Sequence, residues 1–388
     1  MHNNLDPLNR RKFMQRLGFA ALTLPTVSHS FATRSMDKPF QTGAANTPDD
    51  TAQPARKLGV ALVGLGGYST DQLGPALKET KLCELKGIVT GSPDKAQKWK
   101  KKYAIDDKNI YDYKNFDTII NNPNIDIVYV VLPNALHAEY TVRAAGAGKH
   151  VICEKPMAVK VSEAEQMIEA CKKADRLLSI GYRLHFDPYN LQMIRYREKE
   201  TFGNLRKVYA KDGFKIEPHV WRLDKQLAGG GPLMDLGIYC VQGALYTTGT
   251  LPVAVTAQEG DKTDPEKFSE VEQSISWKLE FPHGVIAECD CSYSEEMNLL
   301  RAEAEKGWFA LEPAYEYKGL SGKTSIGENM KFPQVNQQAL QMDDFARCVL
   351  TKSKSKVPGE MGLRDMKILM AIYESARTGK RVSFEHLG

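Results

Sequence analysis

Short apolar runs alternate with amphipathic segments in the first half of the chain. An apolar run of four to eight residues flanked by turn residues is typical of a strand buried on both faces. Such runs predict strands within 57–69, 83–91, 125–133, 149–156 and 176–182. Helical segments are expected at 138–147 and 162–173, and 70–80 has room for one more. This order predicts a doubly wound α/β fold, in which ligands bind beyond the carboxyl ends of parallel strands.

The second half of the chain contains a pattern of period two. Residues 271–281 and 285–293 alternate between apolar and polar side chains and are joined by a Pro-His-Gly turn. Ile275, Trp277 and Leu279 would then share one face of the first strand. The pattern predicts a long antiparallel hairpin with one buried face.

Composition and charge exclude several classes of function. The chain has 388 residues, of which 42% are hydrophobic and 26% charged, and its net charge is +4. This length suits two domains. Positive and negative residues are interspersed, which argues against nucleic acid as a partner. The seven cysteines are scattered and form neither a disulfide framework nor a metal-binding pattern, so no metal site is expected.

The first 32 residues resemble a twin-arginine export signal. Arg10 and Arg11 precede an apolar stretch at 17–27 that is too short to span a bilayer, and a small-residue cleavage site ends at Ala32. The alternative is a basic start with a chance apolar run. Residues 33–56 are polar and aperiodic, which predicts a flexible N-terminal arm. No later window is long enough for a membrane span, so we expect a soluble periplasmic protein with no membrane partner.

A glycine turn after the first predicted strand suggests a dinucleotide site. Gly64 would permit the tight turn and Gly66 would let a pyrophosphate approach the backbone, whereas Ser69 replaces the third glycine of the fingerprint. A plain glycine turn is the alternative, but the surrounding βαβ unit favours a dinucleotide.

The end of the second predicted strand indicates which dinucleotide binds. An NAD enzyme usually has a carboxylate there, but this chain has Thr90, Gly91 and Ser92, followed by Lys95. Ser92 would cap the next helix, whose N-terminus and Lys95 suit a 2′-phosphate. We therefore expect NADP. The other nearby lysines are best explained as a solvated helix face.

Several motifs together resemble the Gfo/Idh/MocA oxidoreductase family and, within it, the glucose-fructose oxidoreductases. The matching stretches include GLGGYS, LPNALHAEY, AGKHVICEKPMA and WRLDKQLAGGGPLMDLGIY, and they run in family order from about residue 58 to 382. The resemblance implies an NADP-binding Rossmann domain at 57–180. It implies a substrate and oligomerisation α+β domain at 181–388 with an open, mostly antiparallel sheet. A homodimer or homotetramer would form through that sheet, and the helix at 361–378 could pack back on the Rossmann domain.

The resemblance and the motifs also assign site residues. The cofactor site is expected to comprise Gly64, Gly66, Gly67, Tyr68, Thr90, Lys95, Tyr113, Leu132, Pro133, Asn134, His137, Glu154, Lys155, Arg183, Trp221 and Arg222. Trp221 and Arg222 would close over the nicotinamide. The glycines at 229–231 would let the chain pass close to substrate or cofactor.

Three residues are the expected catalytic group. Asp235 and Tyr239 are four positions apart in an apolar segment, so a helix would place them on one face. A phenol is a poor base near neutrality unless a cation stabilises its anion. Tyr239 is thus expected to be the acid/base, Lys155 its electrostatic partner and substrate anchor, and Asp235 the group that orients Lys155 and the sugar. The alternative is a buried tyrosine, a buried cap and a surface lysine.

The sequence therefore leaves three functions to compare. The first is an exported enzyme that oxidises an aldose at C1 to the lactone and passes the hydride through tightly bound NADP to a second sugar, fructose giving sorbitol. The second is an ordinary NADP-dependent glucose or xylose dehydrogenase with an exchangeable cofactor. The third is a non-catalytic sugar or nucleotide binding protein.

Overall fold

The structure is a computed structural model that describes residues 56–384. The predicted export signal at 1–32 and the predicted arm up to residue 55 lie outside the described residues.

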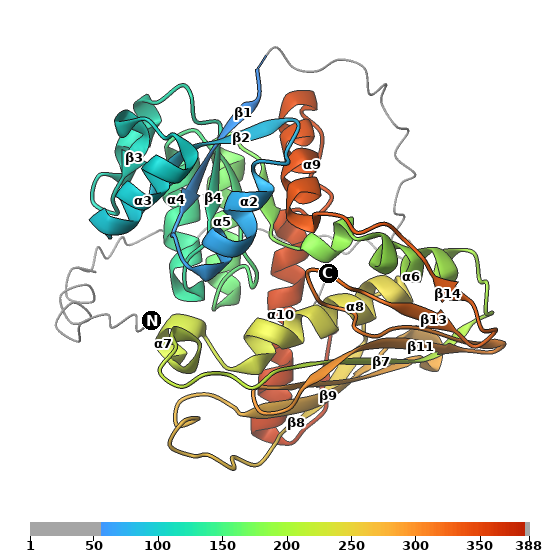
Figure 1. The fold of residues 1–388 in the computed structure, drawn as a ribbon. Coiled ribbons are helices and arrows are strands. Elements are labelled where there is room, and N and C mark those ends of the chain that lie inside the picture. Colours follow the sequence, from blue (N-terminus) through green and yellow to red (C-terminus); the bar gives the residue numbers. More distant parts are fainter. Residues whose placement is uncertain (1–55, 385–388) are drawn as a thin grey trace, which may run out of the picture. The chain divides into compact units, whose positions relative to one another are not determined.

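A six-stranded parallel sheet is built from the first half of the chain (Figure 1). Five of its strands lie within the predicted segments, and the short β3 was not predicted. Its strands are β1 (Leu58–Val63), β2 (Cys83–Val89), β3 (Ile110–Tyr111), β4 (Ile127–Val130), β5 (His150–Cys153) and β6 (Leu178–Ile180). They lie in the order β3-β2-β1-β4-β5-β6, which is that of a doubly wound fold. The central strand β1 is buried along its whole length, as expected for a sheet covered on both faces.

Helices connect these strands. They are η1 (Ser69–Leu73), α2 (Gly74–Ala76), α3 (Pro93–Tyr103), η2 (Asp107–Asn109), η3 (Phe116–Asn121), η4 (Asn134–Leu136), α4 (His137–Gly146) and α5 (Val161–Lys173). The predicted helices at 138–147 and 162–173 are confirmed by α4 and α5. The predicted cap of α3 is also present, because the Ser92 side chain accepts the backbone N–H of Lys95.

A nine-stranded, mostly antiparallel sheet follows. Its strands are β7 (Leu205–Gly213), β8 (Ala254–Glu259), β9 (Ser274–Glu280), β10 (Ile286–Ser292), β11 (Met297–Ala304), β12 (Gly307–Leu311), β13 (Gly322–Thr324), β14 (Asn329–Met330) and β15 (Val382–Ser383). Among the described strands of this second sheet, only β7 and β10 pair in parallel. The predicted hairpin is confirmed by β9 and β10, which pair antiparallel with Cys289 opposite Trp277.

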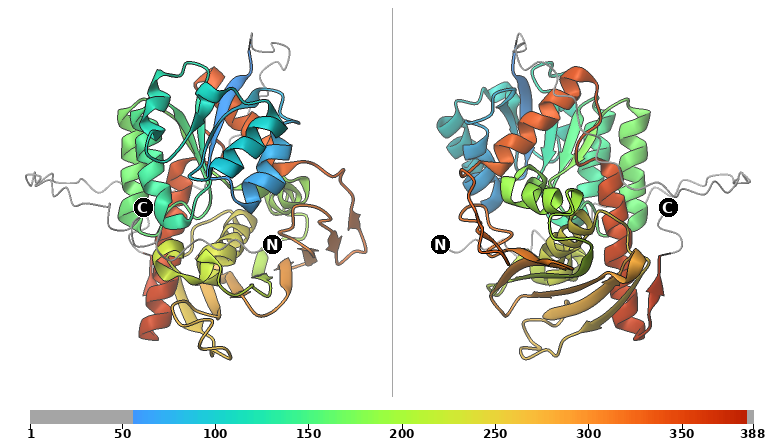
Figure 2. Two further views of the ribbon diagram at one scale, coloured as in Figure 1. Left: turned by 60° about the vertical axis from the view of Figure 1, so that its left-hand side comes forward. Right: turned by 90° about the vertical axis from the view of Figure 1, so that its right-hand side faces the viewer.

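One face of the nine-stranded sheet is covered by helices. The second half contains η5 (Arg183–Phe186), α6 (Pro188–Glu198), η6 (Trp221–Leu223), α7 (Lys225–Ala228), η7 (Leu233–Gly237), α8 (Ile238–Thr248) and η8 (Pro282–Gly284). The largely buried α8 packs on β7, β10 and β11. The opposite face carries ion pairs between partly exposed side chains, among them Lys207–Glu288, Lys278–Glu288 and Lys211–Asp290, and Figure 2 shows no described helix over it.

Two C-terminal helices connect the sheets. Met342 and Phe345 of α9 (Gln337–Thr351) pack in the same apolar cluster as Leu58 of β1, so α9 covers part of the six-stranded sheet. The Asp343 carboxylate accepts the backbone N–H groups of Lys81 and Leu82 just before β2. The longer α10 (Gly359–Thr378) contacts α5 and β6 as well as β8, and Figure 1 shows it running from one sheet to the other.

Candidate active site

Lys155 follows β5 at the carboxyl end of the parallel sheet. Its Nζ donates to the Asp235 carbonyl at 2.6 Å and to the Asp235 carboxylate at 3.0 Å. Only 12% of its side chain is exposed. The loop after β5 therefore positions the Lys155 side chain against the helix that carries the other two expected catalytic residues.

Asp235 lies in η7 between two cations. Besides Lys155, Arg222 Nε approaches its other carboxylate oxygen to 2.8 Å, and the Tyr293 hydroxyl donates to that oxygen at 3.2 Å. Burial pushes the pKa of Asp235 up, but Arg222 and Lys155 outweigh burial and hold it well below the usual range. Asp235 is therefore an anion at all physiological pH values.

Tyr239 lies one turn further along, in α8, and its half-buried ring is surrounded by charged and aromatic groups. Lys155 Nζ is 4.7 Å and Arg183 Cζ 5.1 Å from the ring centroid. The Tyr315 ring stacks at a centroid distance of 6.0 Å. Asp235 and Tyr239 thus face the same lysine, as predicted from their spacing.

These charges decide which residue can exchange a proton. Burial pulls the pKa of Lys155 down, but the Asp235 carboxylate and Tyr239 raise it above the ordinary value for lysine. Lys155 therefore stays protonated and cannot act as a base near neutrality. The Lys155 ammonium lies 4.7 Å from the Tyr239 ring centroid, so it provides a fixed positive charge beside that side chain.

Asp212 is a carboxyl beside this group that the sequence analysis missed. It lies on β7, opposite Cys291 on β10 and Asn298 on β11, and is buried. Burial raises its pKa to about 8, although Lys155 and Arg183 oppose that shift. A single acid in the mixed sequence of 205–213 gives no motif, so only the fold could identify it.

Two tyrosines were also missed. Tyr315 stacks on Tyr239, and the Tyr317 ring lies 4.2 Å from the Arg183 guanidinium carbon and 6.0 Å from the Tyr68 ring. Both follow β12 in a stretch without periodicity. Arg183, which the sequence analysis expected in the cofactor site, is a neighbour of Tyr239.

The glycine turn has the shape that a dinucleotide phosphate needs. Gly64 has φ +96°, and a Cβ there would collide with the Val131 carbonyl and the Leu132 side chain. A Cβ at Gly66 would meet no atom within 4 Å, so that backbone faces open space. Ser69 closes the turn by donating to the Gly64 carbonyl at 2.6 Å. These residues fit the expected pyrophosphate, and the missing third glycine is explained by this internal hydrogen bond.

The expected 2′-phosphate site lies beyond β2. Thr90 is buried and its hydroxyl oxygen accepts the Ser92 N–H at 3.3 Å. Lys95 follows in the first turn of α3. Tyr113 lies against Gly91, where an added Cβ would be 3.2 Å from its ring. Hydroxyl groups, a helix N-terminus and a lysine therefore lie together where NAD enzymes place a carboxylate.

His137 and Asn134, which we expected in the cofactor site, are buried and bonded to backbone carbonyl groups of the protein. His137 is fully buried, with its ring nitrogens 2.9 Å from the Leu132 carbonyl and 2.8 Å from the Pro156 carbonyl. The Asn134 amide donates to the Ala228 carbonyl. Both instead hold loops together, and Pro133 immediately precedes Asn134. The motif revealed their proximity to the site but not the direction of their side chains.

Glu154 is also buried. Its carboxylate accepts the Tyr129 hydroxyl at 2.6 Å and the backbone N–H of Lys155 at 3.2 Å. Burial raises its pKa, against the effects of Tyr129 and Lys155. Glu154 thus orients the backbone of the loop that carries Lys155.

The glycine triplet packs against protein groups, which corrects the expectation that it makes room for a ligand. A Cβ on Gly229 would lie 2.6 Å from the Val159 side chain, one on Gly230 would overlap the Tyr373 hydroxyl, and one on Gly231 would press on Glu272. The Glu272 carboxylate accepts the N–H groups of Gly231 and Leu233. A buried anion therefore satisfies the first N–H groups of the helix that carries Asp235 and Tyr239.

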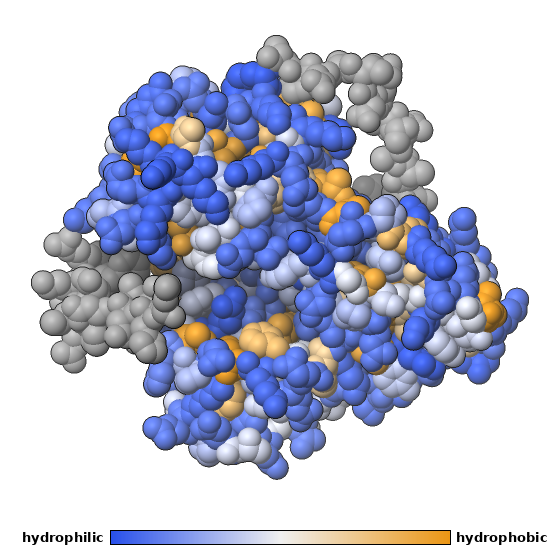
Figure 3. Space-filling view, in the orientation of Figure 1, coloured by the Kyte–Doolittle hydropathy of each residue, from blue (hydrophilic) through white to orange (hydrophobic). Residues whose placement is uncertain are grey.

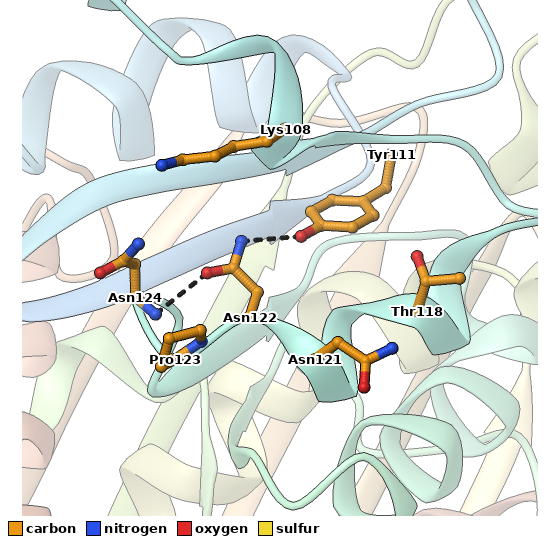
Figure 4. Close-up of a pocket in the computed structure, with 7 residues that line it drawn as sticks. All are labelled: Lys108, Tyr111, Thr118, Asn121, Asn122, Pro123 and Asn124. Carbon is orange, nitrogen blue, oxygen red and sulfur yellow. Dashed lines mark hydrogen bonds between the residues drawn. The ribbon is translucent and has the colours of Figure 1, made fainter.

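The larger of the two cavities described, about 440 Å³, lies away from this group (Figure 4). Part of its polar lining is paired within the protein, since Asn122 donates to the Tyr111 hydroxyl and accepts the Asn124 N–H. In the space-filling view, hydrophilic residues cover most of one face, and a recess separates the parts that contain the two sheets (Figure 3).

Two negative observations apply to residues 56–384. No group of three or more metal-ligating side chains is close enough to hold an ion. No helix there has the length and apolar character of a membrane span.

Family models match both halves of the chain. Residues 58–182 match a model described as an oxidoreductase family with an NAD-binding Rossmann fold. Residues 191–309 match the GFO/IDH/MocA C-terminal domain.

Individual relatives cover most of the chain. The D-xylose 1-dehydrogenase (NADP(+)) of Haloarcula marismortui is 30% identical over 84% of this chain and 92% of its own length. The D-glucoside 3-dehydrogenase of Escherichia coli is 27% identical over 86% of this chain and 99% of its own. The crystal structure of an aldose-aldose oxidoreductase from Caulobacter crescentus, complexed with glycerol, is 44% identical. It covers 84% of this chain and 100% of its own, with a TM-score of 0.82.

Proposed function

The chain belongs to the Gfo/Idh/MocA oxidoreductase family, and from this premise we propose an NADP-dependent sugar–sugar oxidoreductase. It oxidises an aldose at C1 and passes the hydride, through NADP that it does not release, to a second sugar. The observation that carries the proposal is the Lys155 ammonium, which contacts both Asp235 and the Tyr239 ring at the carboxyl end of the parallel sheet. The alternatives are an NADP-dependent dehydrogenase with an exchangeable cofactor and a non-catalytic sugar or nucleotide binding protein.

The residues of this group divide the work of oxidation. Tyr239 takes the proton of the C1 hydroxyl as the C1–H bond breaks, and the product is the lactone. Lys155 stabilises the phenolate charge that this transfer creates, and Asp235 fixes the position of Lys155. When bound, NADP supplies the nicotinamide ring that takes up and later returns the hydride. In the second half-reaction Tyr239 returns the proton to the carbonyl oxygen of the acceptor sugar.

The acceptor is a sugar with a reducible carbonyl group. The glucose-fructose oxidoreductase resemblance favours fructose, which gives sorbitol. The Caulobacter relative, at 44% identity, is named for aldoses in both roles, which favours a second aldose. We propose an aldose as the preferred acceptor and fructose as the alternative, because sequence identity over a fully covered relative is the stronger support.

Export would explain why the cofactor is kept. We propose that the twin-arginine signal carries the folded, loaded protein to the periplasm. No pool of NADP(H) is available there for exchange, so an enzyme that released reduced cofactor would stop after one turnover.

An NADP-dependent aldose 1-dehydrogenase with an exchangeable cofactor is the second candidate. The Haloarcula relative, named D-xylose 1-dehydrogenase (NADP(+)), supports it. The same three catalytic residues would serve this reaction, so the two candidates differ in cofactor release rather than in chemistry.

Absorbance of reduced nicotinamide distinguishes these functions. Glucose or xylose is added to purified protein in buffer without nucleotide. A stoichiometric rise in absorbance that a second aldose or fructose reverses is the result expected for the sugar–sugar oxidoreductase. A rise that needs added NADP identifies the ordinary dehydrogenase, and no turnover with or without NADP identifies a binding protein.

A further inference from the structure

Tyr68 and Tyr317 meet although they belong to different sheets. Tyr68 follows the glycine turn after β1, whereas Tyr317 lies between β12 and β13 of the nine-stranded sheet. Their ring centroids are 6.0 Å apart and the rings are tilted by 34°. The Tyr68 hydroxyl also accepts the Gln338 side-chain amide of α9 at 3.5 Å. The contact therefore closes one side of the glycine turn with a residue from the other half of the chain.

The segment that carries Tyr317 is fixed at its base. The Asn298 side-chain carbonyl accepts the N–H groups of Ala314 at 2.6 Å and Tyr315 at 2.8 Å. Arg183 donates to the carbonyl of Glu316 at 3.1 Å and to that of Tyr315. With these bonds on successive residues, the segment holds Tyr317 in place without help from a ligand.

Arg183 supports the Tyr317 ring from the protein interior. Its guanidinium carbon lies 4.2 Å from the Tyr317 centroid and 5.1 Å from the Tyr239 centroid, and its side chain is buried. Each cation–π contact of this kind is worth about 0.5–2 kcal/mol. Tyr317 is 36% exposed, and Arg183 contacts the inner side of its ring.

We propose that Tyr317 and Tyr68 form a clasp that slows release of the dinucleotide from the glycine turn. The proposal rests on the proposed function and gives it a structural cause, because a ligand on the Gly64–Gly67 turn can leave on this side only after the two rings separate. The segments that carry Tyr68 and Tyr317 are both rigid, which makes that separation slow. Differences in affinity mostly reflect differences in the dissociation rate.

Cofactor retention tests the clasp directly. Wild type and the Tyr317→Ala variant are purified alike, and bound NADP(H) per protein is measured by native mass spectrometry, followed by the rate of loss after dilution into an excess of an NADP-degrading enzyme. We expect wild type to keep its cofactor and Tyr317→Ala to lose it at least about tenfold faster. Tyr317→Phe, which keeps the ring, should behave like wild type. Leu350→Ala, at an exposed position near the end of α9, is the control.

A double-mutant cycle addresses the possibility that Tyr68 also touches the cofactor directly. If the rings act as one clasp, Tyr68→Ala and Tyr317→Ala together should speed release less than the product of their separate effects. Independent, multiplicative effects would overturn the proposal. So would full retention in Tyr317→Ala, including the case in which only its KM for the aldose rises, which would make Tyr317 a sugar contact.

The clasp and the proposed function can fail separately. If wild type is isolated without nucleotide and needs added NADP, cofactor retention is wrong. The clasp is then measured as the Kd for NADP, which should rise about tenfold in Tyr317→Ala but not in Leu350→Ala. Equal Kd values for wild type and Tyr317→Ala would overturn the clasp as well.

Discussion

At the scale of single residues, the proposed catalytic group combines two fixed charges with a phenol that we propose as its acid/base. Lys155 and Asp235 hold their charges through mutual contact, and Tyr239 carries the hydroxyl. The motifs revealed all three, because each residue type is informative at its position. They did not reveal Asp212, Tyr315 or Tyr317, which reach the site only through the pairing of distant strands.

Replacing Tyr239 by Phe should remove the proton acceptor and leave the ring. The rate of nicotinamide reduction in a single turnover with aldose should fall by about 10²–10⁴-fold, the usual contribution of general acid–base catalysis. Stopped-flow absorbance of the loaded protein measures this rate. Tyr315→Phe, which removes the neighbouring hydroxyl, should stay close to wild type. A Tyr239→Phe variant as fast as wild type would show that another group takes the proton.

Asp212 predicts a pH dependence of stability. Its pKa is raised to about 8 in the folded protein, whereas unfolded Asp titrates near 4. The bound proton therefore contributes stability that is complete below pH about 4 and is lost as the pH rises through about 8. Between pH about 4 and pH about 8, Asp212 lowers the free energy of unfolding by about 1.4 kcal/mol for each unit of pH increase.

Urea unfolding of Asp212→Asn and wild type at several pH values measures this slope. The variant should gain stability relative to wild type as the pH rises from 5 to 8. A difference independent of pH would mean that Asp212 is ionised throughout that range.

At the scale of elements, the helix that carries Asp235 and Tyr239 is positioned at its start. Glu272 accepts its first N–H groups and Tyr373 donates to Glu272 at 2.8 Å. Periodicity predicted the strands, the helices and the hairpin, because burial imposes those periods. Periodicity could not predict the role of the glycine triplet. A glycine is needed wherever a neighbour leaves no room for a Cβ, whether that neighbour is a ligand or another part of the protein.

Replacing Gly230 by Ala should disturb this start. The new methyl group would overlap the Tyr373 hydroxyl, and overpacking of this kind costs about 1–3 kcal/mol of stability. The aldose oxidation rate should fall as well, because Asp235 and Tyr239 follow in the same helix. Thermal unfolding and single-turnover rates report the two effects.

Gly146 provides the control for that change. A Cβ there meets nothing within 4 Å, and Ala is a better helix former than Gly, so Gly146→Ala should keep or slightly raise stability. Equal stability of the two alanine variants would contradict the packing argument.

At the scale of the whole molecule, the family resemblance anticipated the two kinds of sheet but not how α9 joins them. That helix returns from the second half of the chain to cover the first sheet, through Met342 and Phe345. A single amphipathic pattern shows that a helix has a buried face but not which partner covers it. The doubly wound alternation of strands and helices was predictable because few topologies satisfy the handedness of βαβ units.

The proposed export predicts a change of compartment. Replacing Arg10 and Arg11 by Lys keeps the charge but removes the paired arginines of the signal. We expect the protein to remain in the cytoplasm with its signal uncleaved, while wild type is recovered from the periplasm at a lower mass. Cell fractionation with intact mass measurement decides this. Equal periplasmic recovery of both would remove the main argument for a retained cofactor.

The outer face of the nine-stranded sheet is where we propose that a second copy binds. Glu288 lies between Lys207 and Lys278 there, at 2.8 and 3.3 Å. Glu288→Lys would place three lysines together and should shift a dimer or tetramer toward monomer, as measured by light scattering. Glu305→Lys, at an exposed position beyond β11, serves as the control. An oligomer that is unchanged by Glu288→Lys, or a wild-type monomer, would contradict this interface.

All seven cysteines are buried, and none is in a disulfide. Burial raises the pKa of Cys83 and Cys171 to about 12, so these thiols are neither accessible nor ionised in the native state. The chain can therefore complete its fold in a reducing cytosol and needs no oxidative maturation afterwards. Alkylating reagents would label it only during opening of the native structure, which makes its own thiols a built-in probe of unfolding rates.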